Sequence, residues 1–231
     1  VGSEMCIRDR FPGDALATRQ LFVYRFPATD YAFTIVADRI QPEVSVTQLV
    51  VYQLSESDRV IAADIELDIR EAAIREWNLK APQDYSIVAL TGANVSDYVV
   101  ASETDSGLRN VKVFFGQDVQ GRQLISLRLE KNEVASAGDW SLPRLDFPEA
   151  KAVRGDIGIV AVPGYRIVVG TTDLLVEKPL SYFPKPVANL QQAYRIREPG
   201  WSATMQIEEL ERRIQSDVFQ LYSLSQGSVY G

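Results

Sequence analysis

The chain has 231 residues, with 24 Lys and Arg against 31 Asp and Glu, and its formal net charge is −7 at neutral pH. An acidic chain without a basic run argues against nucleic acids and anionic membrane surfaces as partners, and no apolar run approaches the roughly 20 residues of a membrane span. The sequence has no His, which excludes Ser-His-Asp and Cys-His nucleophilic sites, His-based zinc sites and haem ligation by His.

The first ten residues, VGSEMCIRDR, have neither the apolar centre of a secretory signal nor the Arg-rich amphipathic pattern of a transit peptide. The segment 1–10 resembles the translation of a transposase-end sequencing adapter, GTG GGC TCG GAG ATG TGT ATA AGA GAC AG. The resemblance implies that residues 1–10 are a non-native tail without a defined place in the fold. It also implies that Cys6, the single Cys, is not native, and that the true N-terminus with any export signal is missing.

The rest of the chain is dominated by alternating apolar and polar residues, rich in Val, Ile, Tyr and Phe, which predict antiparallel β-strands. The stretch 60–70, VIAADIELDIR, is the clearest example because its apolar and charged residues fall on opposite faces. Turn residues gather at 55–58, 104–107, 120–122 and 163–164. These spacings predict an all-β fold, an antiparallel β-sandwich module plus a smaller β-unit. The other predicted strands are 21–26, 31–37, 46–54, 85–92, 97–102, 111–116, 123–129, 155–162, 165–170 and 173–178.

An internal repeat is indicated when the chain is shifted against itself by 170 positions. Residues 22–54 then align with 192–224 without a gap, and aromatic, apolar and acidic classes coincide, as for Tyr31 with Trp201. A large ring that recurs at one point of each copy is expected to be structural. The chain is therefore interpreted as a fragment of a repeat array with a period near 170 residues.

The segment 205–222 has two alternative interpretations. Its apolar residues are spaced as in an amphipathic helix, but the aligned copy is rich in Val and has Pro42 opposite Arg212, which disfavours a helix. Strand is the preferred prediction, and helix remains the alternative.

The repeat suggests a division of the chain. Residues 11–42 are expected to end a preceding β-unit, 43–135 to form a β-sandwich module, and 140–212 to form a second, smaller β-unit. Residues 213–231 are expected to begin the next module. The stretch 134–138, rich in Ala, Ser and Gly, is the predicted linker.

The stretches LTGANVSDYVV (90–100), VQGRQLISLRL (119–129) and PEAKAVRGDIGIVAVPGYRIVV (148–169) carry a resemblance. Their succession resembles the tandem β-sandwich modules, with short linking β-units, of very large bacterial envelope proteins of unassigned function. The resemblance implies a spacer, adhesin stalk or scaffold outside the cytoplasm, with neighbouring repeats as partners and no catalytic residues.

An acidic row, Asp64, Glu66 and Asp68, is the candidate Ca²⁺ site, because hard cations prefer oxygen ligands. Carboxylates on alternate positions of a strand lack a turn that folds around an ion, and antiparallel strands commonly have one solvated face. A solvated face is the preferred explanation, and no other metal or cofactor is expected.

Aromatic residues allow a second function, a carbohydrate-binding module, in which exposed rings stack on sugars. Aromatic residues on strands are more often buried, so a core position is expected for most of them. Phe114 and Phe115 cannot both face inward in a regular strand, and with Tyr98 they are the possible ligand-facing rings. The aromatic residues considered are Trp77, Tyr98, Phe114, Phe115, Trp140, Tyr182, Phe183 and Trp201.

A carboxylate-based enzyme, such as a glycoside hydrolase accessory domain, is the third function considered. It needs two facing carboxyl groups, one with a raised pKa. The available residues are Glu130, Glu133, Asp146 and Glu149. The preferred prediction is a non-enzymatic structural or interaction repeat.

Overall fold

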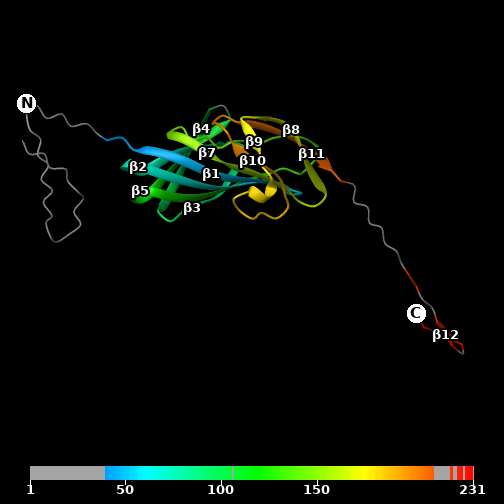
Figure 1. The fold of residues 1–231 in the computed structure, drawn as a ribbon. Helices are drawn as coiled ribbons and strands as arrows, with labels where there is room; N and C mark the ends of the chain where they lie inside the picture. The colour runs from blue at the N-terminus through cyan, green and yellow to red at the C-terminus, as the bar shows by residue number, and fades with distance from the viewer. Residues whose placement is uncertain (1–39, 106, 211–218, 221–222, 226, 231) are drawn as a thin grey trace, which may run out of the picture. The chain divides into compact units, whose positions relative to one another are not determined.

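The computed structural model describes residues 40–105, 107–210, 219–220, 223–225 and 227–230 (Figure 1). The described residues are almost entirely β-strand, with one short 3-10 turn, which confirms the all-β prediction. The strands are β1 (Glu43–Leu54), β2 (Asp58–Pro82), β3 (Ser86–Gly92), β4 (Val95–Asp105), β5 (Leu108–Asn132), β6 (Gly138–Ser141), β7 (Ala150–Ala161), β8 (Tyr165–Asp173), β9 (Leu175–Glu177), β10 (Leu190–Ile196), β11 (Ser202–Glu209), β12 (Ser223–Ser225) and β13 (Ser228–Tyr230).

The strands form one large sheet, one small sheet and a separate hairpin of β12 and β13. The large sheet has the order β3-β5-β2-β1-β7-β10-β9, with β4 also paired to β5, and the small sheet has the order β6-β11-β8. The sequence predicted antiparallel pairing throughout, but β1 and β7 are parallel, so the large sheet is mixed. The reason is topological: the chain passes through β2 to β6 before β7 enters on the free side of β1, and alternating residues do not specify that direction.

The two longest strands, β2 and β5, both bend where their pairing is interrupted. Ile69 pairs with Gly121 and Ile74 with Val119, so β2 has extra residues there. Glu71 (φ 65°) and Gly121 (φ 74°) adopt the left-handed backbone that such bulges require. Residues 120–122 therefore form a bulge within one strand, where the sequence predicted a turn between two strands.

Beyond the bend, the far halves of β2 and β5 contribute to the same hydrophobic core as the near halves, giving the sandwich. Trp77 on the far half of β2 is fully buried in that core and stacks on Phe147, with ring centroids 5.6 Å apart. The small sheet completes the covering layer. Tyr52 on β1 makes edge contacts with Trp140 and Trp201 at 6.4 Å, and its hydroxyl donates to the Pro143 carbonyl.

The small sheet meets the large sheet at a seam made by glutamine side chains. Gln191 lies in a bulge of β10, where the register to β7 shifts. Its amide oxygen accepts a hydrogen bond from the backbone N–H of Ile167 on β8 at 2.8 Å, and its amide nitrogen donates to the Tyr165 carbonyl at 3.1 Å. Gln192 donates to the Ile167 carbonyl at 3.5 Å. These amides occupy the place that a neighbouring strand would take along this part of β8.

The large sheet contains strands from both sides of the predicted boundary between the two β-units. β1, from the segment 43–135, pairs along its length with β7, from the segment 140–212, so strands on both sides of the predicted linker share one sheet. Residues 1–39 lie outside the described residues, as does the segment 211–218, so the 170-residue repeat stays a prediction. Within 205–222, residues up to Glu209 are strand.

Candidate functional site

A surface segment, residues 178–190, crosses the outer face of the large sheet, the face turned away from the core; we call it the strap. Lys178 Nζ lies 2.7 Å from Asp156 Oδ1 on β7, and Lys185 Nζ lies 3.1 Å from Asp64 Oδ2 on β2. Asp64 and Asp156 are both opposite Leu49 of β1, one on each side. The strap is therefore tied across three adjacent strands by two ion pairs. Its short turn is seen in yellow in Figure 1.

Between the two ties, an apolar contact holds the strap down. Phe183 is buried on the outer face, together with Val160 and Ala193. Gly158 on β7 permits this approach, because a Cβ atom there would lie 2.8 Å from Phe183 Cζ and 2.9 Å from Leu190 Cδ1. The contact is a small second core on a face that also carries ion-paired side chains.

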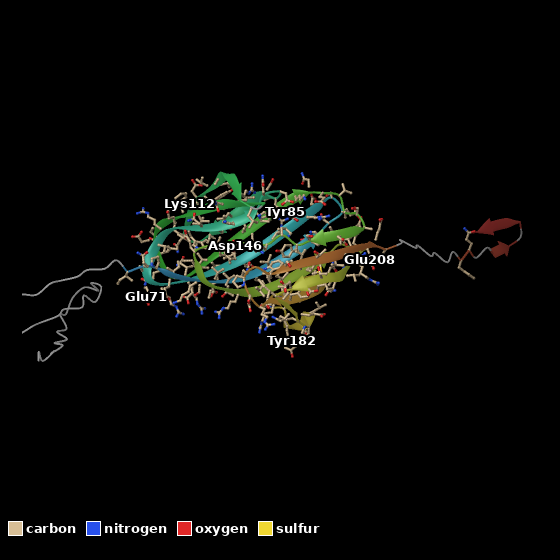
Figure 2. All side chains as sticks on the ribbon, turned by 90° about the horizontal axis from the view of Figure 1, so that it is seen from above. Glu71, Tyr85, Lys112, Asp146, Tyr182 and Glu208 are labelled. Atoms are coloured by element: carbon tan, nitrogen blue, oxygen red, sulfur yellow. The ribbon has the colours of Figure 1, made fainter. Side chains whose placement is uncertain are left out.

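The strap presents one aromatic ring to solvent. Leu180–Tyr182 form the 3-10 turn η1, in which the Tyr182 N–H donates to the Pro179 carbonyl at 2.9 Å and the Phe183 N–H to the Leu180 carbonyl at 3.1 Å. Phe183 points into the sheet while Tyr182 is 72% exposed. Figure 2 shows Tyr182 projecting away from the strands. Every other aromatic residue between 40 and 210 is buried or half-buried.

Beside this turn lies a hollow of about 840 Å³ that is open to solvent. Its polar groups are the Ser181 hydroxyl, the Lys185 ammonium and the Asn189 amide, all on exposed residues. Asn189 has a left-handed backbone (φ 57°), which Asn tolerates better than most residues. The arrangement offers an apolar surface with hydrogen-bonding groups at its edge. The lining residues are Leu180, Ser181, Phe183, Lys185, Pro186, Val187, Ala188, Asn189 and Leu190.

Each carboxylate of the acidic row predicted as a Ca²⁺ candidate has a cationic partner. Asp64 pairs with Lys185 and also accepts a hydrogen bond from the Ser126 hydroxyl at 3.0 Å. The two other pairs are Glu66 with Arg122 at 3.6 Å and Asp68 with Arg70 at 2.7 Å. Among the described residues, no group of three or more acidic side chains is arranged to hold a metal ion. The row is an ion-paired outer face.

The three aromatic residues predicted as ligand-facing do not form a common platform. Phe115 is buried, and Tyr98, opposite the buried Val113, packs partly against the core. Phe114 is half-buried on the opposite face of β5. The sequence does not single out the strap, because Tyr182 and Phe183 stand in a group of aromatic residues of which most are expected to be buried. The available signal was the spacing of Pro179, Pro184 and Pro186, which is incompatible with a paired strand.

The carboxylates considered for glycoside hydrolysis are each engaged in a different contact. Glu130 pairs with Arg128 at 2.7 Å, and Glu133 pairs with Arg59 at 2.6 Å. Glu149 accepts a hydrogen bond from Asn78 at 2.6 Å, and Asp146 accepts one from the backbone N–H of Phe147 at 3.0 Å.

Glu133 belongs to a chain of charges at one end of the sandwich. Lys131 lies 2.8 Å from Asp84 and 2.7 Å from Glu133, and its hydrogen bonds to these two carboxylates raise the pKa of its ammonium group. Arg59 also lies over the Trp140 ring, 5.5 Å from its centroid. Burial raises the pKa of the neighbouring Tyr85 hydroxyl. This cluster connects the end of β5 to the covering layer.

Within the described residues, no helix has the length and apolar character needed to cross a membrane. No protein-family model and no curated protein matches the sequence. Among solved structures, the chain is similar to an M1 zinc metallopeptidase from Deinococcus radiodurans (9% identity, TM-score 0.43), covering 72% of this chain and 43% of that one. It is also similar to yeast LTA4 hydrolase (11%, TM-score 0.44; 72% and 29% covered) and to a non-cellulosomal cohesin from Archaeoglobus fulgidus (11%, TM-score 0.33; 51% and 91% covered). The chain thus spans less than half the length of the two enzymes.

Proposed function

We propose that the chain is a non-catalytic β-sandwich module that acts as a structural and interaction repeat of a long extracytoplasmic bacterial protein. The observation that carries this proposal is the strap, a segment tied down at two points that presents Tyr182 to solvent. A segment whose backbone is held in this way suits recognition, because that backbone loses little conformational freedom when a partner binds.

A spacer role is supported by the way in which the two layers are joined. β2 and β5, each of 25 residues, run through the bend and contribute to both layers. The layers therefore separate only if these two strands lose their pairing or their buried side chains. A module of this kind holds its two layers together through its own core, which suits a unit of a repeat array.

The carbohydrate-binding alternative is favoured by the exposed Tyr182 on a turn whose Ser181 and Phe183 line a hollow with hydroxyl, amide and ammonium groups. The enzyme alternative has less support, because the considered carboxylates lie in separate ion pairs and hydrogen bonds.

Turnover assays test the non-catalytic part of the proposal. The 231-residue chain is incubated with panels of chromogenic glycosides and fluorogenic peptides, and no turnover above background is expected. Turnover that is lost in Glu133→Gln, with Glu76→Gln as the matched surface control, would contradict the proposal. The complete coding sequence tests the other part: it is expected to contain an export signal and further copies spaced by about 170 residues. A single copy without an export signal would contradict the repeat and the location.

A further inference from the structure

We propose that the strap hollow binds a neutral oligosaccharide, with one sugar ring stacked on Tyr182. This inference rests on the proposed interaction function and names its ligand class. A pyranose ring has a face of C–H groups and a rim of hydroxyl groups, so it needs an exposed aromatic face next to hydrogen-bonding side chains. The exposed Tyr182 lies in the chain between Ser181 and Phe183, which both line the hollow, and Lys185 and Asn189 add polar groups to the same lining.

The backbone that carries the Tyr182 ring is held before any ligand arrives. Its own N–H is bonded to the Pro179 carbonyl, and the next residue, Phe183, is buried over Gly158. Lys178 and Lys185 tie the segment to the sheet on either side. Preorganisation of this kind reduces the entropy lost on binding, which matters for a shallow site.

The size of the site favours a small ligand over a protein partner. A hollow of about 840 Å³ falls within the range of about 300 to 1,000 Å³ that is typical of small-ligand sites. A stable protein interface needs about 800 Å² from each partner. The exposed apolar side chains in this region, Val176, Leu180 and Tyr182, are too few to supply the centre of such an interface.

The charges around the strap favour a neutral ligand over an acidic one. Lys185, the cation at the hollow, is already paired with Asp64. Glu66 and Asp68, further along β2, are paired with cations as well, and the whole chain has a net charge of −7. An anionic sugar would therefore approach a net negative chain, and the residues that line the hollow offer it no unpaired cation.

Calorimetric titration of the 231-residue chain with cellohexaose, chitohexaose and maltohexaose tests the proposal. Saturable binding of at least one of these neutral oligosaccharides is expected. Tyr182→Ala should weaken that binding by about tenfold, and Tyr182→Phe, which keeps the ring, should change it by less than about threefold. Leu124→Ser replaces an exposed apolar side chain elsewhere on the outer face and should leave binding unchanged.

Each contrary outcome overturns a different statement. If none of the three sugars binds the folded chain, the glycan inference fails and the non-catalytic module remains. The site assignment fails if binding persists unchanged in Tyr182→Ala. If hexagalacturonate binds more tightly than the neutral sugars, the ligand class is wrong. Hydrolysis of a bound sugar by the chain would overturn the proposed function itself.

Discussion

The two faces of the large sheet are held by different kinds of interaction. The inner face has alternate apolar residues of β1, β2 and β7 buried under Trp77, Trp140 and Trp201. Among the described residues, the strap covers the outer face and is held there by two ion pairs and the contact of Phe183 with Gly158. Most of the buried apolar side chains lie on the inner face, so the outer face can carry the strap, the segment for which we propose a role in recognition.

The largest effect is expected from removing a ring on the inner face. Trp77→Ala should lower the free energy of unfolding by about 3 to 5 kcal/mol, because it leaves a cavity against Phe147. Tyr182→Ala, an exposed ring on the strap, should change it by less than about 0.5 kcal/mol. Urea denaturation of both variants measures the difference. Equal decreases in the free energy of unfolding for the two variants would contradict the contrast between the two faces.

A smaller effect is expected when a side chain is added beneath the strap. Gly158→Ala places a methyl group against Phe183 and Leu190 and should cost about 1 to 3 kcal/mol by overpacking. Hydrogen exchange at the Tyr182 and Phe183 amides should accelerate while exchange in β1 stays slow. Gly116→Ala is the matched control, because its nearest neighbour would be Ser96 Cβ at 3.8 Å. Equal exchange rates at these two amides in both variants would contradict the role of Gly158 in seating the strap.

The two ties of the strap are expected to differ in strength. The side chains of Lys178 and Asp156 are 14% and 16% exposed, whereas those of Lys185 and Asp64 are 57% and 37% exposed. Lys178→Met leaves a mostly buried carboxylate poorly compensated and should cost about 1 to 3 kcal/mol. Lys185→Met should cost about 0 to 1 kcal/mol, and its cost should shrink further in about 0.5 M salt. Urea midpoints at low and high salt test this order.

The smallest effect at neutral pH is expected at Tyr194, on the inner face of β10. Burial, and next the charge of Glu177, raise the pKa of its hydroxyl to about 12. The unfolded chain releases this proton near pH 10. The neutral Tyr194 hydroxyl therefore contributes fully to the free energy of unfolding below about pH 10, and this contribution is lost as the pH rises through 12.

Tyr194→Phe should therefore cost only about 0.5 kcal/mol near pH 7, since the hydrogen bond that it removes, to Gln192, is 3.4 Å long. Above about pH 10, the variant should lose less stability than the parent chain. Urea midpoints measured at about pH 7 and about pH 11 provide the comparison. An identical alkaline loss in both proteins would rule out Tyr194 as a source. Tyr52, whose pKa is also raised by burial, is retained in both.

The local part of the fold could be predicted from the sequence. In 60–70, period-two alternation places Ile65, Leu67 and Ile69 on one face, and all three are buried. The turn at 55–58 follows from its Ser and Asp residues, and Ser55 does bond to Asp58 there.

The non-local part could not be predicted in the same way. Gly121 suits a turn and a bulge equally well, and only its partner strand decides between them. The parallel pairing of β1 with β7 likewise depends on how distant segments meet. At the candidate site, the exposure of Tyr182 and the burial of Phe183 depend on Gly158, which belongs to another strand.

The glutamine seam bears on how such a module changes in evolution. Along β8, Gln191 and Gln192 provide hydrogen bonds that would otherwise require a neighbouring backbone. A sheet edge that is closed by side chains is opened by a point mutation, whereas one that is closed by a strand is opened only by a deletion. One substitution at Gln191 would remove two of these three hydrogen bonds and expose that part of the β8 edge to pairing with another strand.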